Sequence, residues 1–175
     1  FLPSPPPSRK RIAVYPPPPF QQSTLKTIIY DIGDKENVRQ LREIELDGRY
    51  VSSRKIGATL YLVANQGLGD YRIMPAPAEA EAENFAPSYR DTAIQNDFIK
   101  IGYEQIRYFP GFLTPNYLLV AGLNLEQNTT PVEVQAFLGA GETIYASLEH
   151  LYITVSNYGC GNPEIRRLPI APAGP

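Results

Sequence analysis

The chain has 175 residues and a mass of 19.5 kDa, which is typical of one domain and is enough to bury a hydrophobic core. Its 16 Lys and Arg and 18 Asp and Glu give a net charge of −2. This balance argues against binding to nucleic acid, because neutralising phosphates requires an excess of cations. One Cys and one His exclude an internal disulfide, a four-cysteine zinc site and a multi-histidine metal site in this sequence.

Proline dominates residues 1–24. Because proline fixes φ and lacks a backbone donor, we expect an extended linker or surface arm here rather than a strand of a central sheet. A ligand for an aromatic groove is the alternative interpretation of the same composition. The sequence has no apolar run near the roughly 18 residues that a membrane-spanning helix needs, so we expect no membrane span.

Short β-branched and aromatic segments bounded by turn residues predict strands through the middle of the chain. Alternation of apolar and polar residues is clearest in residues 132–138 and 151–155, which is typical of half-buried strands. The predicted strands cover residues 27–32 (TIIYDI), 50–54 (YVSSR), 60–65 (LYLVAN), 117–123 (YLLVAGL), 132–138 and 151–155.

Residues 38–46 are ambiguous. Val38, Leu41 and Ile44 have helical spacing, whereas residues 42–46 alternate with Ile44 and Leu46 on one face. We predict a strand, because this segment occupies the place of a strand in an internal repeat.

The repeat joins two stretches. TIIYDI, REIEL, DGRYVSSR and LYLVAN in the first match YLLVAGL, VEVQAFL, GAGETIYAS and LYITVSN in the second. Each copy contains four short strands with polar turns, which is the size of one blade of a β-propeller. Blades bury their apolar faces by stacking, so we expect Leu60, Leu62, Leu151 and Ile153 to point into a core between two blades.

The same segments resemble the secreted bacterial and archaeal β-propeller domain family, which is distantly similar to WD-repeat propellers. The resemblance rests on residues 42–65 (REIELDGRYVSSRKIGATLYLVAN), IRYFPG (106–111), NYLLVAGLNL (116–125) and FLGAGETIYASLEHLYIT (137–154). It implies an exported protein whose propeller has no assigned activity, and it transfers no catalytic residue.

We therefore predict an all-β fold of antiparallel four-stranded blades, forming about two blades of a propeller over residues 25–158. Residues 66–115 are expected to be a long irregular insertion, and residues 159–175 an irregular tail. Because a propeller ring needs four or more blades, we expect this piece either to belong to a longer chain, or to cover its open blade edges by self-association or with its own Pro-rich arm.

Aromatic side chains gather around Pro110 and Gly111 in the insertion. Tyr108, Phe109 and Phe112 are the candidate partner-binding residues, since aromatic faces stack on sugars and grip peptide side chains. Packing that anchors the insertion is the alternative, and we weigh it more heavily.

Several motifs contain part of a known catalytic or binding arrangement but lack its remaining residues. Gly139 and Gly141 begin a dinucleotide fingerprint whose third glycine is absent, so a β-turn is favoured. Ser147 and His150 lack an orienting carboxylate in the sequence around them. Asp91, Asp97 and Glu104 suggest a glycosidase pair, against which we favour solvated loop acids.

Two polar motifs receive a structural interpretation. The DIGDKEN segment, with Asp31, Asp34, Glu36 and Asn37, carries oxygens suited to calcium, but Asp and Asn are also ordinary turn formers, and we favour a turn. Asn128-Thr129-Thr130 fits a glycosylation pattern that we also interpret as a polar turn.

These observations favour an exported, non-catalytic propeller module that acts as a scaffold or binding surface at the cell exterior. Its expected partner is a protein or a polysaccharide, and no cofactor is predicted. A hydrolase or lyase on the same fold is the alternative. In an exported protein, we expect Cys160 to be buried or to pair between chains.

Overall fold

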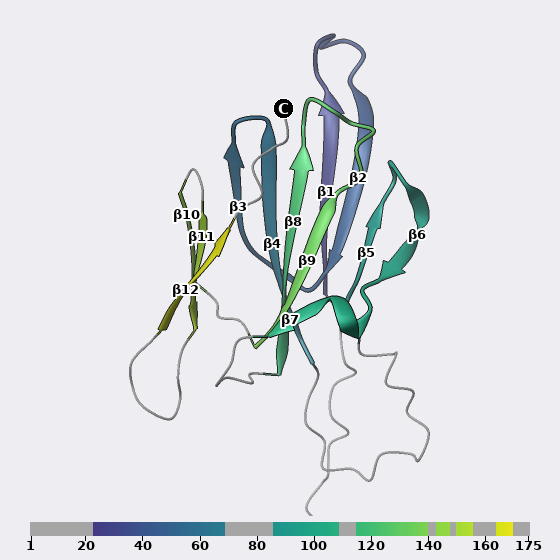
Figure 1. Cartoon of the computed structure of the whole chain (residues 1–175). Coiled ribbons are helices and arrows are strands. Elements are labelled where there is room, and N and C mark those ends of the chain that lie inside the picture. Colours follow the sequence, from purple (N-terminus) through teal and green to yellow (C-terminus); the bar gives the residue numbers. More distant parts are fainter. Residues whose placement is uncertain are drawn as a thin grey trace, which may run out of the picture.

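Figure 1 shows the computed structural model of the chain, in which strands gather into sheets. The structure describes residues 23–68, 86–108, 115–139, 143–147, 150–155 and 164–169. Most of the predicted Pro-rich arm, the first part of the insertion, most of the tail and Cys160 lie outside the described residues.

The described residues form twelve strands and one short 3-10 helix. In chain order these are β1 (Thr24–Asp31), β2 (Arg39–Asp47), β3 (Arg49–Ile56), β4 (Thr59–Gly67), β5 (Ser88–Asp91), β6 (Gln95–Lys100), η2 (Tyr103–Gln105), β7 (Ile106–Tyr108), β8 (Asn116–Asn124), β9 (Glu133–Leu138), β10 (Thr143–Ala146), β11 (His150–Val155) and β12 (Glu164–Pro169).

The strands belong to three sheets. Sheet A has the order β1-β2-β5-β6, sheet B has the order β3-β4-β8-β9-β7, and sheet C has the order β10-β11-β12. Every described pairing is antiparallel except that of β7 with β9. The predicted all-β architecture of antiparallel sheets is therefore confirmed, although among the described residues only sheet A has the predicted four strands.

The chain crosses from sheet A to sheet B at Gly48, the single residue between β2 and β3. Its φ is 105°, and a Cβ there would lie 2.6 Å from the carbonyl carbon and oxygen of Asn65. Only glycine fits both the backbone conformation and this close approach. Gly139, which follows β9 in the second copy of the repeat, also has a positive φ, of 78°.

Both copies of the repeat thus share one local design, in which a hairpin ends at a glycine of positive φ and a second hairpin follows. The two hairpins of each copy lie in different sheets, since β1-β2 belongs to sheet A and β3-β4 to sheet B. A blade therefore does not coincide with one copy of the repeat. Sheet B instead combines the second hairpin of the first copy with the first hairpin of the second copy.

Sheets A and B bury a common apolar core between them. Alternate residues of each strand face inward, because successive side chains in a strand point to opposite faces. The buried cluster contains Ile44, Leu46, Leu62, Ala64, Ile101, Leu119, Ala121, Leu123, Val132 and Ala136. Leu60 packs against it, so Leu60 and Leu62 face a core between two sheets, as predicted; the side chains of Leu151 and Ile153 lie outside the description.

The ambiguous segment 38–46 is a strand over Arg39–Asp47, and Ile44 and Leu46 are fully buried on its inner face. The insertion is more regular than we expected. Residues 86–108 of the insertion supply β5 and β6 to sheet A and β7 to the edge of sheet B. Within the predicted tail, residues 164–169 likewise form a strand, which completes sheet C.

Candidate interaction surface

The face of sheet A that points away from the core carries a row of side chains across all four strands. Lys26 on β1 lies opposite Glu45 on β2, and Glu45 lies opposite Arg90 on β5. The Arg90 guanidinium lies 5.8 Å from the ring centre of Phe98 on β6, within the range of a cation–π contact. We call this surface the outer face of sheet A.

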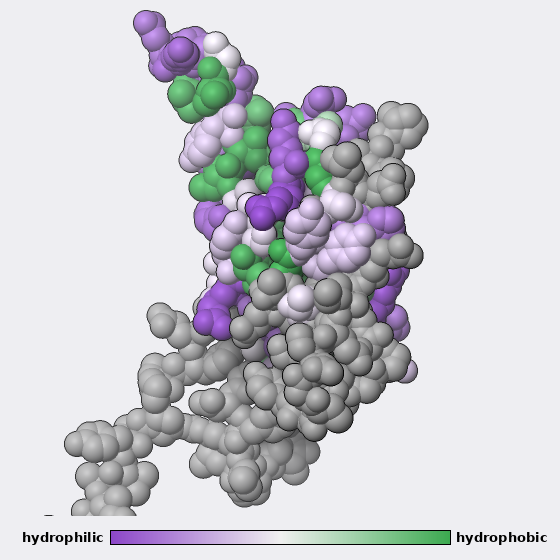
Figure 2. Space-filling model, turned by 90° about the vertical axis from the view of Figure 1, so that its left-hand side faces the viewer, coloured by the Kyte–Doolittle hydropathy of each residue, from purple (hydrophilic) through white to green (hydrophobic). Residues whose placement is uncertain are grey.

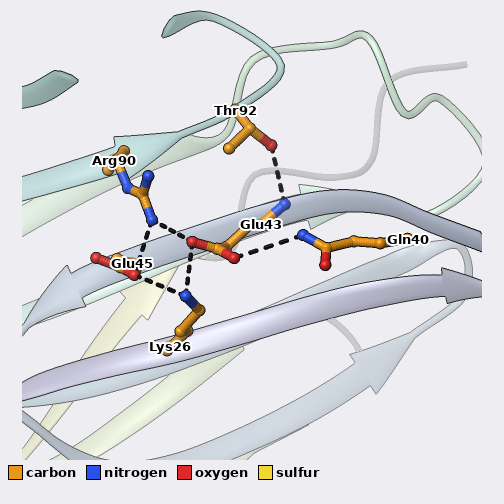
Figure 3. A network of polar contacts seen from close by, with 6 residues as sticks. All are labelled: Lys26, Gln40, Glu43, Glu45, Arg90 and Thr92. Atoms are coloured by element: carbon orange, nitrogen blue, oxygen red, sulfur yellow. Dashed lines mark hydrogen bonds and ion pairs between the residues drawn. The ribbon is translucent and has the colours of Figure 1, made fainter. Parts of the chain in front are cut away.

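Figure 3 shows the polar network at the centre of this face. Lys26 Nζ lies 2.8 Å from Glu43 Oε1 and 3.3 Å from Glu45 Oε1. Arg90 Nη2 lies 2.8 Å from Glu45 Oε1 and also contacts Glu43. The two cations and two carboxylates therefore balance in charge.

The network favours the ionised form of Glu43. The Lys26 ammonium beside Glu43 lowers the pKa of that carboxyl, and Glu43 in turn raises the pKa of Lys26. The pKa of Arg90 is raised, chiefly by its hydrogen bond to Glu45. Each of the two cations contacts both carboxylates, an arrangement suited to holding the strands in register.

The β1–β2 hairpin exposes apolar side chains toward its end. Figure 2 shows this hairpin, the highest element of Figure 1, rising above the rest of the molecule with hydrophilic residues at its end and hydrophobic residues below them. The exposed apolar residues of the hairpin are Ile28, Tyr30, Ile32, Val38 and Leu41. Ile32 is 70% exposed, so the hairpin offers contact area that the described part of the chain leaves open to solvent.

Tyr108 is the one predicted partner-binding residue within the described part of the chain. It ends β7, the edge strand of sheet B, and its side chain is 67% exposed. Phe109 and Phe112 lie outside the described residues, so the structure does not test whether the three aromatic side chains gather.

Asp91 has a different environment from the one predicted. We expected a solvated loop acid, but Asp91 is fully buried and forms an ion pair with Arg42, whose side chain is 1% exposed. Burial alone would raise the pKa of this carboxyl, but hydrogen bonds from Arg42, Val132 and Ala93 outweigh burial and lower it. Asp91 is therefore a structural carboxylate.

The other two acids of the suggested glycosidase pair lie at the surface, as expected. Asp97 is exposed on β6, and Glu104 is exposed in η2. Because Asp91 is buried against Arg42, it is not available as one of the two carboxyl groups across a cleft that glycoside hydrolysis requires.

Ser147 binds the backbone of His150. Its hydroxyl accepts a hydrogen bond from the His150 amide at 3.0 Å and donates one to the carbonyl oxygen at 3.2 Å. The Ser147 amide also donates to that carbonyl at 2.8 Å. These contacts close the turn between β10 and β11, which accounts for the spacing of the two residues.

The DIGDKEN segment is a turn stabilised by its own side chains. Asp31 Oδ1 accepts from the Gly33 amide at 2.9 Å, and Asp34 Oδ1 accepts from the Glu36 amide at 3.0 Å. Asn37 Nδ2 donates to Asp34 Oδ2, which lowers the pKa of Asp34. Among the described residues, no group of three or more His, Cys, Asp or Glu is arranged to hold a metal ion.

The Asn128 motif is also a turn, since the Thr130 amide donates to the Gln127 carbonyl. Sequence reasoning missed its role: the carbonyls of Asn128 and Thr130 accept hydrogen bonds from the buried Arg42 guanidinium. The only signal in the sequence was an arginine at an inward position of the alternating REIEL segment.

These observations describe an all-β protein in which face-packed antiparallel sheets carry a charge-paired outer face and an exposed hairpin. A family model described as the Beta propeller domain matches residues 4–168. The chain therefore belongs to the β-propeller domain family. Comparison with curated proteins found no match, and comparison with solved structures found none either. No helix in the described residues is long and apolar enough to cross a membrane.

Proposed function

We propose that this chain is a non-catalytic module that binds a partner, or serves as a scaffold, at the cell exterior. The observation that supports this proposal is that residues 86–108 pair with strands of both sheets. Strands β5 and β6 pair into sheet A and β7 pairs into sheet B, so this segment is fixed to both sheets. Its last residue, Tyr108, presents a largely exposed aromatic ring.

A rigid scaffold that displays an aromatic side chain is suited to recognition, because little conformational freedom is lost on binding. Tyrosine combines a large apolar face with a hydroxyl, which serves contacts with either a sugar or a peptide. The partner is accordingly a polysaccharide or a protein of the cell surface. Among the carboxylates considered for catalysis or metal binding, Asp91 is paired with Arg42, and Asp31 and Asp34 accept hydrogen bonds within a turn.

Binding is tested with purified chain and washed cell-wall material from the organism that encodes it. We expect the chain to sediment with the wall material, and Tyr108→Ala, Phe109→Ala or Phe112→Ala to reduce the bound fraction while the circular dichroism spectrum stays unchanged. Tyr145→Ala is the matched control, because Tyr145 in sheet C is also 67% exposed.

Equal retention of all four variants, or no retention of the parent chain, would contradict the binding proposal. Export is tested separately by antibody detection in cell and culture fractions. Protein confined to the cytoplasm would contradict the exterior location and leave the binding result standing.

A further inference from the structure

The order of strands in sheets A and B raises a question of assignment. After β4, the chain leaves sheet B, adds β5 and β6 to sheet A, returns through β7 and then pairs β8 with β4. Strands that follow one another along a chain usually lie side by side, so the simpler fold would place β5 beside β4. Some feature of the sequence must make the observed strand order more stable than that alternative order.

Arg42 and Asp91 provide such a feature. Arg42 lies on the inner face of β2 in line with Ile44 and Leu46, at a position where the alternation calls for an apolar side chain. Arg42 Nε donates to Asp91 Oδ1 at 2.8 Å, and Nη2 donates to Asp91 Oδ2 at 2.5 Å. Both side chains are almost fully buried, so each depends on the other for neutralisation.

Most of the remaining polar contacts of the pair come from the loop of the other sheet, and one comes from the turn that follows β5. Arg42 donates to the Asn128 and Thr130 carbonyls at 3.2 and 2.8 Å, in the loop that joins β8 to β9. Asp91 Oδ2 accepts from the Val132 amide at 2.9 Å, and Oδ1 accepts from the Ala93 amide at 3.0 Å. Only the observed arrangement brings β2, β5 and this loop to one point.

The alternative arrangement would leave both charges without partners. If β8 lay beside β2, its inward side chains, Leu119, Ala121 and Leu123, would offer Arg42 no acceptor. If β5 lay beside β4, Asp91 would face Leu62 and Ala64, which offer no donor. Burying an unpaired charge is far more costly than the net gain from the pair.

We propose that the Arg42–Asp91 pair is a lock that assigns β5 to sheet A and β8 to sheet B. The pair acts by raising the free energy of the fold in which these two strands are exchanged. It need not add much net stability to the native fold. This role goes beyond partner binding and does not depend on it.

The test uses the whole chain with both charges removed, in the variant Arg42→Met/Asp91→Asn, which keeps an acceptor for the Val132 amide. NMR then follows the β5 residues. We expect a second set of amide signals, with an intensity of about a tenth of the total or more, and with cross-strand contacts from β5 to β4. For the parent chain we expect one set, with contacts between Leu46 and Tyr89 across β2 and β5.

Two further variants complete the test. Arg42→Lys keeps the charge but loses the bidentate geometry, and we expect it to show the second set of signals at lower intensity. This variant still provides a test if the double variant does not fold. Leu118→Ala, a core substitution remote from the pair, is expected to show one set only. A single set with β2–β5 contacts in Arg42→Lys, together with a single set in the double variant or its failure to fold, would overturn the proposal.

Discussion

Arg42 and Asp91, 49 positions apart in the chain, form a bidentate ion pair in the interior between sheets A and B. The Arg42 guanidinium also binds two carbonyls of the β8–β9 loop. One buried contact therefore joins β2, β5 and a loop of the opposite sheet.

Removing one charge of this pair is expected to destabilise the fold strongly. Asp91→Asn leaves the Arg42 cation buried without a counter-ion, which costs about 3–5 kcal/mol in the free energy of unfolding. Urea denaturation of the parent chain and the variant measures this difference. A loss below about 1 kcal/mol would mean that water reaches the guanidinium and that the pair behaves as a surface contact.

The same carboxylate predicts a response to acid. The folded-state pKa of Asp91 lies below its ordinary value of 3.8, so its ionised form stabilises the fold at any pH above that value. This stabilisation falls as pH drops below 3.8 toward the folded-state pKa. Thermal unfolding of the parent chain and Asp91→Asn between pH 7 and pH 2 should show a decline in this range that is weaker in the variant. Parallel curves would exclude Asp91 as the source.

Two glycines with positive φ allow the cost of a strained backbone conformation to be measured apart from the cost of a steric clash. Gly57→Ala, at φ 58° with no atom within 4 Å of the new Cβ, is expected to cost about 1 kcal/mol for the left-handed conformation alone. Gly48→Ala adds a clash with the Asn65 backbone and should cost more than about 2 kcal/mol. Equal losses in chemical denaturation would show that the crossing between the sheets relaxes freely.

The exposed hairpin is expected to affect association more than stability. Ile32→Ser and Val38→Ser change side chains that are 70% and 53% exposed, so each should shift the free energy of unfolding by less than about 0.5 kcal/mol. If the apolar hairpin promotes self-association, sedimentation velocity will show less oligomer in the double variant. Unchanged oligomer content would contradict a role of the hairpin and would favour association through the open strand edges.

The sequence predicted individual strands better than their partners. The internal repeat identified residues 38–46 as a strand, whereas periodicity alone slightly favoured a helix, since Arg42 occupies an inward position beside Ile44 and Leu46. Strands β5 and β6 were missed, because their residues are mostly polar and β6 is almost entirely exposed. They are strands because β5 pairs with β2 and β6 pairs with β5, and no local sequence pattern reports these pairings.

The repeat predicted the hairpins but not their grouping into sheets, since the two hairpins of one copy lie in different sheets. Period-two alternation shows which side chains share a face, but it does not show where a chain leaves one sheet for the next. Gly48 marks that point through a backbone conformation and a contact with Asn65 that only the folded chain reveals. For the same reason, Asp91 could not be recognised as buried, since its partner lies 49 positions away.

The division of the first four strands between two sheets is the defining feature of this fold. Backbone NOE measurements on the isotope-labelled chain test this division directly. We predict cross-strand contacts between Leu46 and Tyr89 and between Leu62 and Ala121, with none joining β2 to β3 as paired neighbours. Contacts showing β1 to β4 hydrogen-bonded as one continuous four-stranded sheet would contradict it.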